Sequence, residues 1–541
     1  MAAQKAEGVM TMNRRELMAG LAAGTVVVPF ATSASAQVPA FMQGVAQAAS
    51  QDEDLAAFYR ARNFEGIWSG TDRAAQERRN ALLAAFAIAP DHGLPAARYD
   101  PQALIGRIRA ATQPIDQGMM EVELSRLFLQ FARDIQTGIL TPGQIDDGLK
   151  LQVPYRARLG TLQAFAQSTP AAFLRSLPPS SPEYGRLLRE KAIMERMLAA
   201  GGYGPTVPGG KLEPGASGPA VVALRNRLIT MGFLDRSVSQ DYDAALQAAV
   251  QRYQAANGLS TDGVAGQGTL DEINRPLEAR LASVIVALER ERWMNSPRGA
   301  RHIWVNIPDF TARIVDNDNV TFECRAVVGQ TSVDHQTPEF SDVMEFMIIN
   351  PSWYVPRSII VKEYLPQLQA NPFAASNLQI TDAYGRVVDR STADFNAYTQ
   401  SNFPFSMREP PSQGNALGRV KFLFPNPYNI YLHDTPSKSL FNREVRAFSH
   451  GCVRLGDPFD FAYTLLARQE ADPQAVFKAG LDTGVETRVD LVDPVPVHLT
   501  YRTAFTNVTG GVQFRRDIYR RDRDIWNALA QAGVAVRAIA A

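Results

Sequence analysis

Glycine and proline are concentrated in one internal segment, and this segment constrains the fold more than any other feature of the chain. It reads GGYGPTVPGGKLEPGASGP and covers residues 201–219. Such a composition cannot continue a helix or a strand, so we interpret the segment as a linker. The chain has 541 residues, which is too long for a single core, and we expect three or more domains.

The residues before the linker show the periodicity of helices. Apolar residues recur at three- and four-residue spacing in AQERRNALLAAFAIA and in MMEVELSRLFLQFARDIQTGIL. We therefore predict a helical domain over residues 50–200. After the linker, residues 212–275 contain two amphipathic segments that end at Gly232 and Gly258, followed by a third in TDGVAGQGTLDEIN. This spacing predicts a small three-helix module.

Strand patterns dominate the C-terminal half, after a connecting helix in RLASVIVALERERWMN. The segment HIWVNIPDFTARIVDNDNVTFECRAVVGQ predicts a hairpin, with DNDN as its turn and Cys324 on its second strand. We expect a β-rich domain over residues 300–496, followed by a C-terminal extension at 497–541. Mixed helical and loop patterns at 362–418 predict an insertion that is too long to be an idle loop. The whole chain is therefore predicted to be a multidomain α+β protein.

The N-terminus has the pattern of a bacterial export signal. The twin arginines Arg14 and Arg15 precede an apolar run at 17–30, and a small-residue sequence, ASA, then precedes Gln37. This pattern predicts a cleaved, Tat-like signal at 1–36. The alternative is a membrane anchor, but the apolar run is shorter than the ~20 residues that span a bilayer. We expect a periplasmic protein with no membrane anchor after cleavage.

Charge is balanced, since the chain has 55 Lys and Arg residues and 55 Asp and Glu residues. This balance gives no reason to expect a nucleic-acid partner. There are two cysteines, Cys324 and Cys452. In an oxidising compartment they could form a disulfide, or Cys452 could stay free because it reacts. For Cys324 we favour a small buried residue on a strand.

Cys452 lies in the motif AFSHGCVRLGDP. The strand-like run NIYLH ends at His433, and the 15 residues 434–448 separate this histidine from Ser449. A thiol becomes a nucleophile when a histidine accepts its proton and a third group fixes the tautomer of that histidine. Consecutive backbone N–H groups at a glycine-containing turn can stabilise an oxyanion. The pattern predicts a thiol–imidazole catalytic site.

This arrangement resembles the signature of the L,D-transpeptidase family, in which a histidine, a spacer of this length and Ser/Thr-His-Gly-Cys follow one another. The segments NPSWYVPRSI, HDTPSKSLF and RAFSHGCVRL resemble parts of these enzymes. The three-helix module, with YDAAL, VQRYQ and DGVAG, resembles a peptidoglycan-binding domain. The domain order is similar to that of the large periplasmic enzymes of Gram-negative bacteria. The positions that match the signature are His433, Ser449, His450, Gly451 and Cys452.

The resemblance implies a two-step acyl transfer on peptidoglycan stem peptides. The Cys452 thiolate attacks the carbonyl of meso-diaminopimelate in a donor tetrapeptide, the terminal D-alanine leaves, and a thioester forms. The side-chain amine of an acceptor stem then attacks, which gives a 3→3 cross-link. His433 would be the general base and later the acid, oriented by the backbone carbonyl of Asp434. Backbone N–H groups of His450, Gly451 and Cys452 would form the oxyanion hole, and the His450 imidazole is either catalytic or only packs locally.

Further residues are candidate substrate contacts. The insertion at 362–418 resembles a capping subdomain over the active site, which would shape and gate access. The family often has Asn two residues after the cysteine, where this chain has Arg454. This arginine either pairs with a substrate carboxylate or pairs with Asp457. The candidate contacts are Ser449, Tyr354, Arg408, Asn415 and Arg454.

Other activities remain consistent with the same residues. Water in place of the acceptor amine would make the protein an L,D-carboxypeptidase, and a lysine amine would make it an enzyme that anchors a lipoprotein to the wall. A non-enzymatic alternative is a wall-binding scaffold with a Cys324–Cys452 disulfide. We expect no cofactor and no metal, because His302, His335 and His498 show no ligand spacing. The expected partners are peptidoglycan stem peptides and glycan, and the resemblance implies that carbapenems acylate Cys452.

Overall fold

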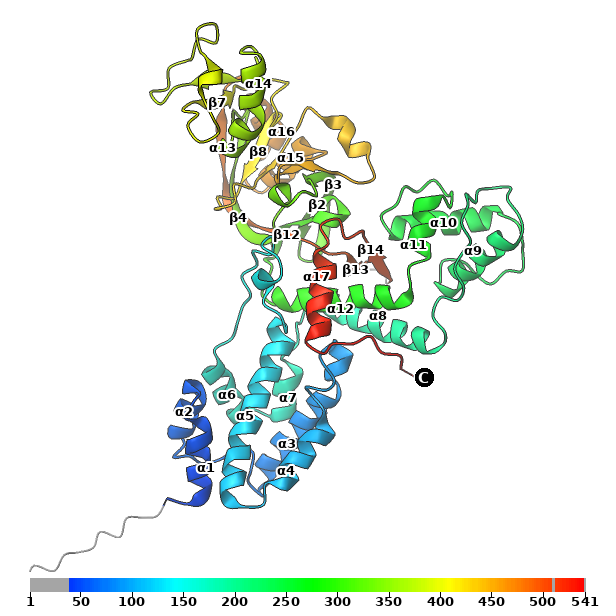
Figure 1. The fold of residues 1–541 in the computed structure, drawn as a ribbon, viewed down its shortest axis with the longest axis vertical. Coiled ribbons are helices and arrows are strands. Elements are labelled where there is room, and N and C mark those ends of the chain that lie inside the picture. Colours follow the sequence, from blue (N-terminus) through cyan, green and yellow to red (C-terminus); the bar gives the residue numbers. More distant parts are fainter. Residues whose placement is uncertain (1–37, 508–510, 540–541) are drawn as a thin grey trace, which may run out of the picture.

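The structure is a computed structural model that describes residues 38–507 and 511–539. The predicted export signal at 1–36 lies outside the described residues. The N-terminal helices lie at one end of the molecule, the main sheet lies beyond them, and the three-helix module projects to the side (Figure 1). Within the described ranges, no helix combines the length and the apolar character that crossing a membrane requires.

The first helical unit is built around the long helix α5, which packs against α1. Its core stacks Trp68, Phe128 and Phe165, and the buried carboxylate of Glu121 accepts hydrogen bonds from backbone N–H groups of the loop before α3. Asp72 caps α3 by accepting a hydrogen bond from the backbone N–H of Ala75. The helices are α1 (Ala40–Ala49), α2 (Glu53–Arg60), α3 (Arg73–Ala87), α4 (Pro101–Ala110), α5 (Pro114–Thr137), α6 (Arg158–Gln167) and α7 (Pro170–Arg175).

A second helical core joins segments that are far apart in the sequence. Helix α8 (Pro182–Ala199) packs on α12 (Leu277–Trp293), and α17 (Arg521–Gln531) packs on the same helix. Buried Arg290 of α12 pairs with Asp522 of α17 at 2.7 Å and with Glu339 of the sheet domain at 2.6 Å. The helix that was predicted only as a connector is therefore the element that joins the helical region, the C-terminal extension and the sheet.

The three-helix module has the predicted helices. They are α9 (Pro219–Thr230), α10 (Ala244–Ala256) and α11 (Gln267–Ile273), which share one apolar core. Gly232 and Gly258 follow the first two helices with positive φ values of 80° and 65°, a conformation that glycine adopts without steric cost. The helical region, this module and the β-rich domain confirm the predicted α+β class.

The β-rich domain is a nine-stranded sheet in the order β10-β3-β11-β9-β8-β4-β12-β1-β2, and a further β3–β2 pairing brings its ends together. Helices α15 (Pro458–Leu466) and α16 (Pro473–Asp482) contribute to its core. The strands are β1 (Arg301–Asn306), β2 (Thr311–Asp316), β3 (Asn319–Gly329), β4 (Phe340–Ile349), β8 (Val420–Leu423), β9 (Leu432–His433), β10 (Ala447–Ser449), β11 (Val453–Leu455) and β12 (Thr487–Thr500).

The expected hairpin is present, because β2 and β3 pair as antiparallel strands on either side of the DNDN turn and Cys324 lies on β3. A further strand, β1, precedes it, because the chain turns at Ile307–Asp309 and Phe310 adopts a positive φ of 55°. The expected domain boundary at residue 496 falls inside β12, which pairs with both β4 and β1 through Leu499. The C-terminal extension therefore starts after Thr500, and it contains the hairpin β13 (Ala504–Thr506) and β14 (Val512–Phe514) before α17.

The insertion forms a small subdomain with its own apolar core at the far end of the sheet domain (Figure 1). Its three strands pair in the order β5-β7-β6. The subdomain begins at Trp353, earlier than the expected limit at 362, because β5 belongs to this second sheet. Its elements are β5 (Trp353–Tyr354), α13 (Arg357–Ile359), a π-helical turn (Ile360–Tyr364), α14 (Leu365–Ala370), β6 (Gln379–Thr381) and β7 (Ser406–Glu409). We call residues 353–409 the cap.

Candidate active site

A cavity of about 860 Å³ lies between the cap and the main sheet. The sheet domain contributes the thiol of Cys452 and the imidazole of His433, which come from different segments of the chain. The cap contributes Tyr354 and Glu363. The sequence signature therefore converges on one cavity, and the cap forms part of its wall.

The turn between β10 and β11 places Cys452 in this cavity. Gly451 has a positive φ of 117°, and a Cβ atom there would lie 3.1 Å from Ile430 Cδ1. The Ser449 hydroxyl donates to the Cys452 carbonyl and accepts from the Gly451 N–H at 3.1 Å. Thr337 Oγ1 donates to the Gly451 carbonyl at 2.7 Å. These bonds fix the backbone on both sides of the nucleophile.

The same bonds bear on two sequence predictions. The Gly451 N–H was expected in the oxyanion hole, but it already donates to the Ser449 hydroxyl. Ser449, a candidate substrate contact, lines the cavity, but it is buried and its hydroxyl stabilises the turn. Its role as a substrate contact stays a prediction, and so do the roles of the backbone N–H groups of His450 and Cys452 in the oxyanion hole.

The C-terminal extension supports the turn from behind. The Tyr519 hydroxyl donates to the Gly329 carbonyl at 2.6 Å, and the Gly329 N–H donates to Thr337 Oγ1 at 2.9 Å. Thr337 in turn holds the Gly451 carbonyl. A continuous hydrogen-bond path therefore links residue 519 to the cysteine turn. No sequence motif marks this path, because its members lie in separate segments of the chain.

His433 lies at the end of β9, as predicted, and is 4% exposed. Its Nδ1 donates to the Asp434 carbonyl at 2.5 Å, which leaves Nε2 free of a proton in the neutral ring. The Asp434 carboxylate is itself held by the backbone N–H of Arg419 at 2.8 Å and by Lys438 Nζ at 2.7 Å. Burial and the positive charge of Arg454 lower the pKa of His433 to about 3, so the ring is neutral near pH 7.

The thiol is also neutral at rest. Burial raises the pKa of Cys452 to about 11, although Tyr431 and Arg454 act in the opposite direction. Sγ lies 3.5 Å from the Asn429 carbonyl, to which it donates. Among residues 38–507 and 511–539, no hydrogen bond joins Sγ to His433. Proton transfer from thiol to imidazole is therefore not complete before substrate enters.

Arg454 follows the cysteine on β11, opposite His433 of β9. Its Nε is buried and has no hydrogen-bond acceptor, and the described residues contain no ion pair between this guanidinium and Asp457. Burial lowers the pKa of Arg454. Of the two alternatives for Arg454, the pair with Asp457 is not formed. The guanidinium lines the cavity with its charge uncompensated by a carboxylate.

The other predicted contacts divide into two groups. Tyr354 is 63% exposed and lines the cavity. Arg408 lies on β7, where it donates to Ser352 Oγ at 2.7 Å, and it does not line the cavity. Asn415 is fully buried and its amide donates to the carbonyls of Glu409 and Pro410. Arg408 thus joins the cap to Ser352, Asn415 bonds to the last residue of the cap, and neither side chain lines the cavity.

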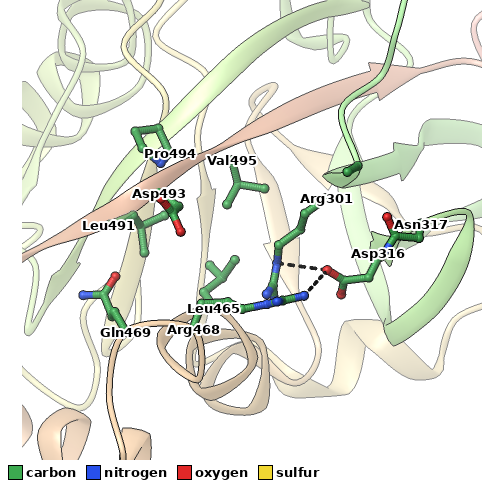
Figure 2. A pocket seen from close by; sticks show the side chains of 11 residues that line it. Arg301, Asp316, Asn317, Leu465, Arg468, Gln469, Leu491, Asp493, Pro494 and Val495 are labelled. Carbon is green, nitrogen blue, oxygen red and sulfur yellow. Dashed lines mark hydrogen bonds and ion pairs between the residues drawn. The ribbon is translucent and has the colours of Figure 1, made fainter.

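A second cavity on the sheet domain, of about 260 Å³, has a different character. Figure 2 shows that Arg301 and Arg468 both reach Asp316, with the shorter contact, from Arg468, at 2.9 Å. Both arginines of this cavity therefore pair with Asp316. Neither cysteine lines it, and we assign it no catalytic role.

Both cysteines are free. The disulfide that the scaffold alternative required is therefore not formed. Cys324 lies on β3 in the main core, where burial raises the pKa of its thiol to about 12. This is the small buried residue that the sequence favoured.

Alkylation with iodoacetamide tests the two thiols. We expect one adduct on the native chain, at Cys452, and two after unfolding. The native rate should rise about tenfold per pH unit between about pH 7 and about pH 10, because the thiolate fraction is small below a pKa of about 11. Mass spectrometry over time measures both. A rate that levels off near neutral pH would show that the thiol is already ionised, as in a thiolate–imidazolium pair.

Comparisons with known proteins match three parts of the chain. Residues 300–492 match the L,D-transpeptidase catalytic domain (YkuD), residues 53–190 match the "Scaffold domain", and residues 217–273 match the "Putative peptidoglycan binding domain". The cavity with Cys452 and His433 lies within the part that matches the L,D-transpeptidase catalytic domain.

A relative is the "Putative L,D-transpeptidase" of Haemophilus influenzae, which is 33% identical over 245 residues. The match covers 44% of this chain and 48% of the relative, so the chain spans about half of that protein. A crystal structure of an L,D-transpeptidase from Xylanimonas cellulosilytica (residues 123–326 of that protein) is 17% identical. It covers 55% of this chain and 98% of its own, with a TM-score of 0.17, and the assignment does not depend on it.

Several residues of the site were missed by sequence reasoning. Two of them, Tyr431 and Asn429, lie just before His433 in the sequence. Tyr431 lies beside the thiol, and the Asn429 carbonyl accepts a hydrogen bond from it. The sequence pattern could have indicated Tyr431, because it lies two residues before His433 in the same strand-like run and therefore on the same face. His335 and Glu363 reach the cavity rim from outside the signature, and no local pattern marks them.

Proposed function

We propose that this protein is an L,D-transpeptidase that forms 3→3 cross-links between peptidoglycan stems. The observation that carries the proposal is that a free thiol, a neutral imidazole of fixed tautomer and an unpaired guanidinium line one cavity. Nucleophilic acyl transfer uses the first two groups. The third suits a donor that carries a carboxylate beside the scissile bond.

In the first step, His433 Nε2 takes the proton of Cys452 as Sγ attacks the carbonyl carbon of the donor diaminopimelate. Backbone N–H groups of His450 and Cys452 stabilise the oxyanion. When the C–N bond breaks, the proton passes from His433 to the departing amine of D-alanine, and a thioester remains. In the second step the acceptor amine attacks the thioester, His433 takes its proton, and the thiol returns.

The resting pKa values favour a site that ionises only on binding. A thiolate in this cavity is costly, since burial raises the pKa of Cys452. The positive charge of Arg454 lowers the pKa of Cys452 and so opposes the effect of burial. In this proposal the same guanidinium faces the donor. We propose that Arg454 binds the donor carboxylate and that this contact positions the carbonyl over Sγ.

The exchange of Arg454 for methionine tests this contact. Loss of a charged hydrogen bond costs about 1.5–3 kcal/mol, so we expect KM for a tetrapeptide donor to rise by roughly tenfold to a hundredfold. A donor with a C-terminal amide lacks the carboxylate, so its KM should change little. Steady-state kinetics with both donors measure the difference. Equal effects on the two donors would show that Arg454 does not read the carboxylate.

The remaining parts of the chain fit the same proposal. The cap gates the donor groove through Tyr354 and its neighbours, and the module at 217–273 holds the enzyme on the wall. We propose Tat-dependent export to the periplasm, which the twin-arginine pattern supports. Carbapenems, which present a reactive carbonyl, would acylate Cys452.

The acceptor separates this proposal from its alternatives. Water as acceptor yields a shortened monomer, as in a carboxypeptidase, and a lysine amine yields an anchored peptide. Incubation of the purified chain with a donor tetrapeptide and each acceptor in turn, followed by mass spectrometry, distinguishes the three. Predominant transfer to diaminopimelate is expected, and shortened monomer alone would contradict it.

A further inference from the structure

Three side chains gather at the rim of the active-site cavity without a role in the proposed reaction. His335, Glu363 and His450 each offer one ligand atom, and the three atoms lie within 4.8 Å of one another. Glu363 Oε1 is 2.8 Å from His450 Nε2, and the rings of His335 and His450 have centroids 4.5 Å apart. Two imidazoles and one carboxylate are a common protein ligand set for zinc.

The geometry requires little adjustment to hold an ion. Tetrahedral zinc, with bonds of about 2.0–2.2 Å, separates its ligand atoms by about 3.3–3.5 Å. Here the three ligand atoms all lie within 4.8 Å of one another. All three side chains are partly exposed, so small rotations are open to them. The fourth position would face the cavity, where water can complete the coordination.

The environment also suits a cation. Ser332 Oγ lies 3.3 Å from His335 Nδ1, which leaves Nε2 of that ring for coordination. Asp334 and Lys362, each next in the chain to one of the three residues, pair with each other at 3.0 Å. A bound ion would replace the present contact between Glu363 and His450.

The three ligands come from different parts of the fold. His335 follows β3, His450 precedes the nucleophile in the β10–β11 turn, and Glu363 lies on the π-helical turn of the cap. Single π-helical turns are frequent at functional sites. We propose that His335, Glu363 and His450 bind a zinc-type divalent ion that ties the cap to the turn carrying Cys452. The inference does not depend on which acceptor the enzyme uses.

Calorimetry on the metal-stripped full chain tests the site. The titrations use zinc chloride and the Cys452→Ala background, because the thiol lines the same cavity and is itself a zinc ligand. We expect one zinc ion per chain. Substitution of residues that only hydrogen-bond to metal ligands lowers metal affinity by about 10–100-fold. Loss of a ligand itself, in His335→Ala or Glu363→Gln, should therefore weaken zinc binding by at least about tenfold. Asp334→Asn is the matched control and should change affinity by less than about threefold.

A second readout reports on the cap. Zinc should slow backbone hydrogen exchange in residues 357–370, and His335→Ala should abolish the slowing. Thermal unfolding without metal checks that each variant is folded. The proposal is overturned if zinc does not bind saturably at micromolar concentration, if both ligand variants bind like the parent, or if binding disappears with the Cys452→Ala exchange alone.

Discussion

The exchange of Cys452 for alanine is expected to abolish acyl transfer. The sulfur forms the covalent intermediate, and no other described side chain in the cavity offers a comparable nucleophile. When the catalytic residues of a site act together, loss of the nucleophile reduces turnover by at least about 10⁴-fold. The measurement is product formation from a tetrapeptide donor. Hydrogen exchange or near-UV circular dichroism of the native chain shows whether the cavity is intact.

A carbapenem gives the same exchange a second readout. The wild-type chain should gain the mass of one carbapenem, and the Cys452→Ala chain should gain none. Cys324→Ala is the matched control, because it removes the other thiol from the buried core without touching the cavity. An adduct that persists on the Cys452→Ala chain would show that another group is the nucleophile.

His433 should have the next largest effect. The His433→Gln exchange keeps a polar side chain of similar size but removes the base, so we expect a decrease of about 10²–10⁴-fold in turnover with either acceptor. In the wild type the pKa of His433 lies at about 3, so protonation of the free enzyme's base should not reduce the rate as the pH falls from about 7 to about 5. Rates over this range are measured on both chains.

A loss of activity centred near the ordinary pKa of histidine would contradict this account of His433. The His450→Gln chain is the comparison variant, because its imidazole lies nearby but pairs with Glu363. If His450→Gln lost as much activity as His433→Gln and showed the same pH profile, the base would be wrongly assigned.

Local patterns in the sequence were sufficient to predict the central residues of the site. The run NIYLH placed His433 at a strand end, and the neighbouring Asp434 carbonyl accepts from its ring as expected. The turn that carries Cys452 contains Gly451, whose positive φ is a conformation that glycine adopts easily. Each of these features depends on residues close together in the chain, so a single sequence can show them.

Features that depend on tertiary packing could not be predicted. Asn415 and Arg408 were predicted as candidate substrate contacts, yet their side chains bond to Glu409 and Ser352 at the two ends of the cap. The Gly451 N–H was expected to be free, but the Ser449 hydroxyl accepts its proton. Glu363 approaches His450 because the cap folds over the sheet, and His335 approaches it from the turn after β3. Spacing along the chain carries no information on such contacts.

The central claim is that Cys452 transfers the donor diaminopimelate to the amine of a second stem. One incubation tests it: the purified chain with a disaccharide tetrapeptide as both donor and acceptor, with products read by tandem mass spectrometry. We predict a dimer that has lost one D-alanine and is joined between two diaminopimelate residues, and none from the Cys452→Ala chain. A dimer joined through D-alanine, or equal amounts of dimer from both chains, would contradict the account.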